Sequence, residues 1–303
     1  MSTFTIMYDT GCDMPQDYVE KHDLKIIPLP FHLNDEQYPE GGWQKITGEE
    51  FYAALRNGGV AGTALVNPDQ WAKVFTEYAE RGESLVVIPL SSGLSGTAQN
   101  SVIALNEVKE TYPDCDIHTV DSINATSGIG VLIVKAVKMR AEGKSAAETA
   151  AVLSELRHSC FALFTVDDLM FLHRGGRVSK LQAIAGSIIG IKPLLNVSPE
   201  GTLKLKDKAL GRKASLEALF NQMKRSLAPD TKKFDTVLIG HGDCIADANL
   251  LADLIKAEFE VGEFHIVMIG PIVGAHSGPG TIALFFEADM TRDEYEAKFY
   301  AGK

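Results

Sequence analysis

Cysteine is scarce in this chain of 303 residues, and the four cysteines that occur are far apart. No two of them are spaced as C-x-x-C, which excludes a zinc knuckle and a redox dithiol. Free thiols are typical of the reducing cytosol, so the sequence predicts a cytoplasmic protein. The cysteines are Cys12, Cys115, Cys160 and Cys244.

Positive charge and long hydrophobic runs are also in short supply. Lys and Arg number 29 against 40 Asp and Glu, which gives a formal net charge of −11. Because this charge repels nucleic-acid phosphates and anionic lipid surfaces, neither is an expected partner. The most apolar stretch, residues 183–195, is too short to cross a bilayer and contains Lys192 and Pro193. We therefore predict no integral membrane segment.

Several sequence motifs that are typical of catalytic or cofactor-binding sites are missing. The chain has no G-x-x-x-x-G-K-[ST] phosphate loop and no G-x-S-x-G nucleophile elbow. Asp9 and Asp121 are of the right type to bind a metal, but no H-x-x-H, H-E-x-x-H or EF-hand pattern accompanies them. We therefore predict neither a metal site nor a cofactor.

Short apolar runs alternate with longer amphipathic ones in the first half of the chain. The sequence predicts strands at 4–8, 24–29, 84–90 and 116–120, and helices at 16–21, 47–57, 68–81, 96–112 and 125–141. This alternation predicts an α/β fold, in which a parallel sheet has helices on both faces. The N-terminal domain is therefore expected to be a three-layer α/β/α unit.

The pattern changes between about residues 145 and 165. After a helix that ends near 157, strands are predicted at 161–166, 203–205, 236–239, 265–269 and 281–287, and helices at 180–189, 214–227 and 246–258. Longer strands with fewer crossovers indicate a mixed-sheet α/β domain. At roughly 100–200 residues per domain the length suggests two domains, which we place at 1–155 and 156–303.

The loop at 90–97, which reads LSSGLSGT, is the richest in small polar groups. It follows an apolar strand and opens a helix, whose unpaired N–H groups favour a bound anion. Loops at 9–13, 121–122 and 241–243 also follow strands, and ligands of open α/β sheets bind at that end of the strands. Read alone, each of these loops is also compatible with simple helix capping.

Two later segments carry further candidate groups. In the Gly/Pro-rich loop at 274–281, His276 is suited to donate to an anion or to act as an acid–base group. At 172–180, paired glycines between Arg174 and Arg177 display two guanidinium groups, which suit a phosphate or an acidic partner. For the first segment, the alternative is that His276 only forms hydrogen bonds within its own loop and binds no ligand.

Taken together, these segments resemble the DegV family, whose fatty-acid-binding members are also called FakB proteins. The likeness runs along nearly the whole chain and rests on seven motifs in the family's order. The motifs are the loop ending in Asp13-Met14-Pro15, SSGLSGT at 91–97, Val120-Asp121-Ser122, GGRVS at 175–179, IKPLL at 191–195, His241-Gly242-Asp243 and HSGPG at 276–280.

The resemblance implies a two-domain protein that encloses one long-chain fatty acid in an internal tunnel. It implies that the carboxylate is held by Thr63, by Ser92 with the Gly93 N–H and Ser95 nearby, and by His276. It also implies that a separate ATP-dependent fatty acid kinase converts the acid to acyl phosphate for phospholipid synthesis. Arg177, with Arg174, then becomes a contact to the kinase or to phosphate, and the chain itself is not expected to be catalytic.

The carboxylate and the alkyl tail of a bound fatty acid place different demands on the protein. A buried carboxylate needs compensation, which hydroxyl groups, a helix start and a protonated His276 would supply. The family usually has Thr-Ser-Gln-Pro where this chain has Thr63-Ala64-Leu65-Val66, so polar partners near the head group are lost. Apolar candidates for the tunnel wall, which core packing would explain equally well, are Leu163, Ile184, Ile188, Ile189, Phe285 and Phe286.

Two other functions remain open from the residues alone. Ser92, His276 and Asp121 are the residue types of a serine-dependent acyl-transfer enzyme. The serine loop also suits a small anion or a sugar.

Overall fold

The computed structural model describes residues 4–179 and 190–301. Its N-terminal lobe is built on a parallel sheet with the strand order β2-β1-β6-β7. The central strand β6, Leu85–Ile88, is fully buried along its length, as expected for a parallel strand covered on both faces. The other strands are β1 Thr5–Asp9, β2 Lys25–Ile27 and β7 Ile117–Thr119.

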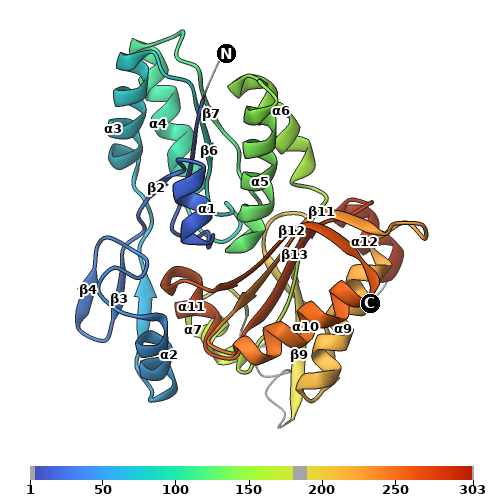
Figure 1. Ribbon diagram of the computed structural model, residues 1–303. Helices are drawn as coiled ribbons and strands as arrows, with labels where there is room; N and C mark the ends of the chain where they lie inside the picture. Colours follow the sequence, from blue (N-terminus) through green and yellow to red (C-terminus); the bar gives the residue numbers. More distant parts are fainter. Residues whose placement is uncertain (1–3, 180–189, 302–303) are drawn as a thin grey trace.

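Helices cover both faces of this sheet (Figure 1). Helices α3 (Pro68–Arg81) and α4 (Thr97–Thr111) lie on one face, while α5 (Ser127–Ala141) and α6 (Ala146–Leu156) lie on the other. The short helix α1, Gln16–Lys21, follows β1. Helix α5 is buried along nearly its whole length because it also packs against strands of the second lobe.

A small antiparallel sheet, β4-β3-β5, extends from the N-terminal lobe beside helix α2 (Gly48–Arg56) (Figure 1). Its strands, β3 Phe31–Leu33, β4 Glu36–Tyr38 and β5 Ala61–Thr63, have only three residues each, and the sequence analysis did not predict them. The sheet matters for the site because β5 ends at Thr63.

The C-terminal lobe contains a six-stranded mixed sheet in the order β10-β9-β8-β13-β11-β12. Only β11 and β12 pair in parallel; the other neighbours are antiparallel. The strands are β8 Cys160–Thr165, β9 Ile191–Val197, β10 Leu203–Leu210, β11 Lys233–His241, β12 Glu260–Met268 and β13 Ile282–Glu287.

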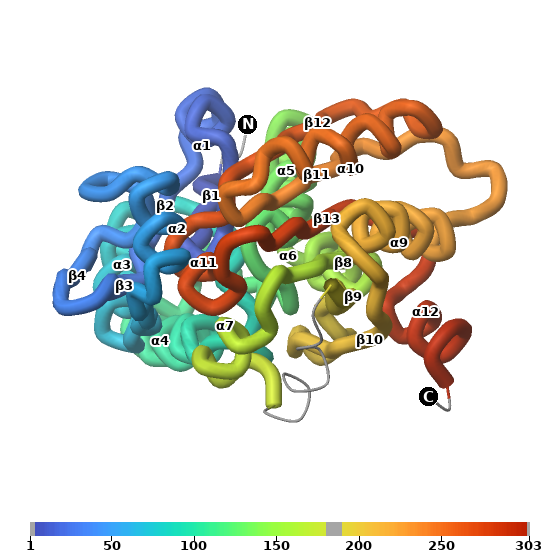
Figure 2. The backbone as a smooth tube through the Cα atoms, turned by 90° about the horizontal axis from the view of Figure 1, so that it is seen from below, coloured from blue at the N-terminus to red at the C-terminus, as the bar shows by residue number. Residues whose placement is uncertain are grey.

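Helices α9 (Arg212–Arg225) and α10 (Ile245–Glu258) cover the outer face of this sheet, and α5 lies against the inner face (Figures 1 and 2). Two short helices, α7 (Leu169–Arg174) and α11 (Pro271–Ser277), pack against each other below α5. Helix α12, Arg292–Phe299, ends the chain. In the part of the chain described here, no helix combines the length and the apolar character that a membrane crossing requires.

The predicted fold class is confirmed: a parallel sheet with helices on both faces is followed by a mixed sheet. The boundary at residue 155 stays a prediction, and the helix expected at 180–189 lies outside the described residues. Helix α4 buries Leu105 and Val108 against the lobe and exposes Val102 and Ile103.

Candidate functional site

A cavity of about 400 Å³ lies at the junction of the two lobes. This volume is in the range of roughly 300–1,000 Å³ that is usual for small-molecule sites. Both lobes contribute to a lining that is mostly apolar. The apolar wall includes Leu29, Leu65, Leu90, Leu94, Ala125, Ala162, Phe164, Leu172, Val197, Leu203, Ile269, Ile272, Val273, Ala283 and Phe285.

Strand alternation decides which residues of β8 and β13 form the wall. Ala162 and Phe164 of β8 pair with Phe285 and Ala283 of β13, and all four line the cavity. Successive side chains of a strand point to opposite faces, so the residues between them turn into a separate core under α9 and α10.

The predictions for the tunnel wall are therefore only partly confirmed. Phe285 is confirmed as a wall residue. Leu163 and Phe286 are wrong, since each is one position out of phase and packs in the separate core of the C-terminal lobe. Ile184, Ile188 and Ile189 lie outside the described residues.

Thr63 and His276 meet in the lining of the cavity. Thr63 ends β5 of the small sheet, His276 lies in the last turn of α11, and the Thr63 Oγ1 to His276 Nε2 distance is 2.9 Å. The sequence analysis expected His276 in a loop. The segment is instead helical from Pro271, which directs the imidazole toward the N-terminal lobe.

His276 is uncharged near neutral pH in this structure. Burial, followed by the positive charge of Arg177, lowers the pKa of His276 from 6.5 to about 4. A protonated imidazole beside a bound carboxylate stays a prediction, because these surroundings by themselves favour the neutral ring. A neutral ring with its proton on Nε2 donates to Thr63 Oγ1 and leaves the threonine proton for a further acceptor.

The paired glycines of the GGRVS motif make room for this ring. A Cβ atom on Gly175 would lie 2.1 Å from His276 Nδ1, so the imidazole can pack here only against a glycine. Gly176 has a φ of +74°, the left-handed conformation that glycine adopts readily. The motif thus positions His276 as well as Arg177.

Arg177 lines the cavity next to this pair. Its Nε and Nη2 donate to the carbonyl oxygen of Leu94 at 3.2 and 3.1 Å, and its Nη1 donates to the carbonyl of Gly175. Both acceptors are neutral carbonyls, so the guanidinium supplies a positive potential to this part of the cavity. Arg174, in contrast, is exposed and stacks on the ring of Phe171 at 4.5 Å.

The serine loop reaches the cavity through only part of its length. Ser95 lines the cavity, while Ser92 and Gly93 do not belong to the lining. The Ser92 hydroxyl donates to Asp121 Oδ2 at 2.5 Å, and the Gly93 N–H donates to Ser91 Oγ at 3.1 Å. The structure thus brings Ser95 together with Thr63, His276 and Arg177 but not Ser92 or Gly93.

Gly93 and Ser91 of the serine loop contact the C-terminal lobe, and this contact explains why these residue types occur here. A Cβ atom on Gly93 would come within 2.7 Å of the backbone of Glu200 and Gly201, in the turn between β9 and β10. The Ser91 hydroxyl donates to the Gly201 carbonyl at 2.9 Å. This part of the loop joins the two lobes.

Two hydroxyl-bearing side chains of the cavity lining were not among the predicted site residues. Ser277 lines the cavity, and its buried hydroxyl has no hydrogen-bond partner among the described residues. Thr281 also lines the cavity, and its hydroxyl contacts the carbonyls of Ser277 and Gly278 at 3.0 and 2.9 Å. The position of Ser277 directly after His276 was the available signal.

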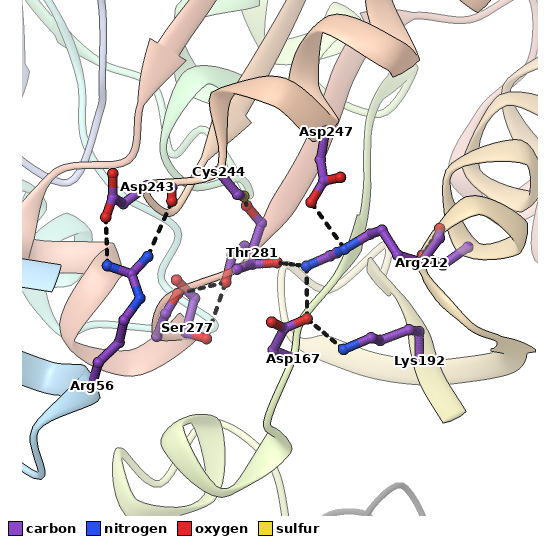
Figure 3. A network of polar contacts seen from close by, with 12 residues as sticks. Arg56, Asp167, Lys192, Arg212, Asp243, Cys244, Asp247, Ser277 and Thr281 are labelled. Atoms are coloured by element: carbon purple, nitrogen blue, oxygen red, sulfur yellow. Dashed lines mark hydrogen bonds and ion pairs between the residues drawn. The ribbon is translucent and has the colours of Figure 1, made fainter. Parts of the chain in front are cut away.

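A charged network lies near the end of α11 (Figure 3). Arg212 pairs with Asp167 at 2.6 Å and with Asp247 at 3.1 Å, and it also donates to the Gly280 carbonyl at 2.5 Å. Lys192 joins Asp167 at 2.6 Å. These contacts hold the loop that follows α11 against the C-terminal lobe.

The residues of the acyl-transfer alternative do not form a chain of nucleophile, base and acid. Ser92 contacts Asp121 directly, whereas His276 contacts Thr63. Among residues 4–179 and 190–301, no cluster of three or more His, Cys, Asp or Glu side chains could hold a metal ion.

Comparison with known proteins places this geometry in a family. A family model described as "Uncharacterised protein, DegV family" matches residues 3–289. A DegV domain-containing protein of Clostridium perfringens is 37% identical over 289 residues, which are 95% of this chain and 99% of the relative. The chain belongs to the DegV family.

Solved structures agree with this assignment. A Thermotoga maritima protein whose structure "reveals fatty acid binding function" is 28% identical, with a TM-score of 0.81 over 95% of this chain and 100% of that one. The Streptococcus pneumoniae Fatty Acid Kinase (Fak) B3 protein, loaded with linoleic acid, has a TM-score of 0.80 over 95% and 100% of the two chains. At 20% identity this second likeness shows that the DegV fold is shared.

Proposed function

We propose that this DegV-family protein binds one long-chain fatty acid in the cavity and presents its carboxylate to a separate fatty acid kinase. The observation that carries the proposal is the uneven lining of the cavity. Thr63, His276 and Arg177 lie close to one another in this lining, and Ser277 and Ser95 are chain neighbours of His276 and of Leu94, whose carbonyl Arg177 contacts. Most of the remaining wall is apolar. A molecule with one anionic end and a long alkyl tail matches this lining.

The head group meets three forms of compensation for its burial. The Thr63 hydroxyl, oriented by His276, donates to one carboxylate oxygen, and the unpartnered Ser277 hydroxyl is available to another. Arg177 supplies a positive charge at short range, which a buried anion requires. Ser92 and Gly93 remain predicted contacts that rest on the family resemblance, since they lie outside the lining.

The tail supplies most of the binding free energy. A sixteen-carbon acid offers about fifteen CH₂ or CH₃ groups at roughly 0.8 kcal/mol each, or about 12 kcal/mol before costs. Immobilisation of the ligand removes several kcal/mol of this gain. A sub-micromolar dissociation constant is therefore within reach without any special contact to the tail.

The kinase step is the finer part of the proposal. The groups at the head-group end are mostly short, so an oxygen of the carboxylate stays accessible to a phosphoryl donor. Exposed Arg174 and the nearby Arg177 form a basic pair suited to an acidic kinase surface or to phosphate. We place the reaction in the cytoplasm, in keeping with four free cysteines.

Native mass spectrometry of the purified protein tests the binding step. We expect a mass excess equal to one long-chain acid, identified after organic extraction. After delipidation, the protein should rebind the acid far better than the alcohol of equal chain length, which has the same tail without the charge. A protein that carries no acid and rebinds none would refute the proposal.

The kinase step needs a separate assay. With ATP and a fatty acid kinase present, acyl phosphate should form from the bound acid. Arg174→Ala should slow this reaction while leaving the amount of bound acid unchanged, because Arg174 lies outside the cavity lining. An unchanged rate would remove Arg174 from the partner contact.

A further inference from the structure

Helix α11 forms one wall of the cavity and carries the histidine that orients Thr63. Ile272 and Val273 of this helix line the cavity together with His276. A shift of α11 by even a fraction of its width would break the 2.9 Å contact between Thr63 and His276. Whatever holds α11 against the N-terminal lobe therefore controls the head-group end.

Two hydrogen bonds tie the start of α11 to the N-terminal lobe. The Tyr52 hydroxyl donates to the Ile269 carbonyl at 2.7 Å, and the backbone N–H of Gly270 donates to Asp13 Oδ1 at 2.9 Å. A Cβ atom on Gly270 would lie 2.4 Å from the same carboxylate oxygen. The approach between Asp13 and the start of the helix is therefore too close for any residue but glycine.

The same carboxylate also holds a cavity residue of its own lobe. Thr126 Oγ1 donates to Asp13 Oδ2 at 2.5 Å, and Thr126 lines the cavity just before helix α5. Thr126 has a φ of +45°, a left-handed conformation that β-branched residues rarely adopt. The hydrogen bond to Asp13 helps to hold this strained backbone in place.

We propose that Asp13 is a positioning residue for the head-group end of the cavity. Its two oxygens join Thr126 on the N-terminal wall to Gly270 at the start of α11 and so fix His276 relative to Thr63. The expected effect of Asp13 on fatty acid binding rests on the proposed function. The coupling between Asp13 and His276 does not, because it can be observed in protein without a ligand.

The surroundings of Asp13 agree with this role. Burial raises the pKa of Asp13 to about 7, although the hydrogen bonds from Thr126 and Gly270 lower it. Among the residues that the structure describes, the titratable side chains that interact electrostatically with it are Tyr8, Cys12 and Tyr52, none of which carries a positive charge. Without a cation to offset its burial, the carboxyl group depends on the two hydrogen bonds that join the lobes.

Replacement of Asp13 by alanine and by asparagine tests the proposal. Asp13→Ala removes both acceptors and should weaken fatty acid binding by about tenfold or more. Asp13→Asn keeps an acceptor for the Gly270 N–H and can donate its amide to Thr126, so it should restore most of the affinity. Rescue by asparagine distinguishes positioning through hydrogen bonds from a need for charge.

The pKa of His276, followed by NMR in delipidated protein, provides a second readout that needs no ligand. In wild type it should lie near 4, and in Asp13→Ala it should move toward the ordinary value of 6.5 as α11 loosens and the ring is hydrated. Leu251→Ala, in the separate core of the C-terminal lobe, is the matched control for lost stability and should move neither the affinity nor this pKa.

Gly270→Ala is the variant for the case in which Asp13→Ala folds poorly, and a double-mutant cycle links the two positions where both fold. Gly270→Ala alone should displace the carboxylate and reproduce both effects, whereas adding it to Asp13→Ala should cause no further loss, because the clash is gone. Wild-type affinity and an unshifted His276 pKa in Asp13→Ala or Gly270→Ala would overturn the proposal. If wild type binds no fatty acid, the proposed function fails, but the shift in pKa still decides the role of Asp13.

Discussion

Replacing Thr63 by valine tests the head-group model at its centre. Valine keeps the branched shape and the strand preference of threonine, so β5 and the small sheet should be undisturbed. The substitution removes one hydroxyl group, which lies 2.9 Å from His276 Nε2 and lines the cavity. Any loss of affinity is then a property of that hydroxyl.

The expected loss follows from the type of hydrogen bond. A hydrogen bond to a charged group contributes about 1.5–3 kcal/mol, and each 1.4 kcal/mol changes the dissociation constant tenfold. We therefore expect Thr63→Val to bind a long-chain acid about 10- to 100-fold more weakly. The contribution of the tail is unchanged, so binding of the alcohol of equal length should barely respond.

The measurement is displacement of a fluorescent fatty acid from delipidated protein, with the free energy of unfolding measured in parallel. Thr111→Val, an exposed threonine at the end of α4, is the matched control and should bind like wild type. A Thr63→Val protein that binds the acid within about twofold of wild type would refute the head-group model, since the remaining groups would then suffice.

Three further predictions use other contacts of the site. Gly175→Ala should weaken fatty acid binding by pressing on the ring of His276, whereas adding it to His276→Ala should cause no further loss in a displacement assay. Ser95→Ala should reduce the affinity more than Ser92→Ala, because only Ser95 lines the cavity; the opposite order by calorimetry would restore Ser92 as the main ligand. Buried Asp9 has its pKa raised to about 6, so its stabilising effect is complete below about pH 3.8 and is lost as the pH rises through 6. Urea unfolding should show Asp9→Asn gaining about 3 kcal/mol relative to wild type between about pH 4 and pH 8, and a constant difference would contradict the raised pKa.

The long helices and buried strands were predictable because each shows one local hydrophobic pattern in the sequence. The apolar run at 85–88 became the buried strand β6, and the amphipathic stretch at 68–81 became α3, with Pro68 in its first turn. The three-residue strands β3 to β5 carry no such pattern. They form because Phe31 and Leu33 pack into the core while β3 pairs with the adjacent β4 on one side and with the more distant β5 on the other.

Helix α11 shows a signal that was present but misread. Its abundance of glycine and proline suggested a loop, yet Pro271 stands in the first turn and Gly278 directly follows the last residue, which are the usual places for these residues at the ends of a helix. The contact of Gly93 with the Glu200–Gly201 backbone had no local signal at all. It joins residues more than a hundred positions apart, and only the packing of the lobes reveals it.

The alternation along β8 and β13 constrains how the ligand preference of this protein can evolve. Ala162 and Phe285 line the cavity, while their immediate neighbours in the chain belong to the separate core of the C-terminal lobe. Exchanging one side chain can reshape the cavity and leave that core intact. Inserting or deleting a single residue within either strand would exchange the two faces of that strand beyond the change, so relatives with other acyl preferences should differ here by substitution and keep the same strand lengths.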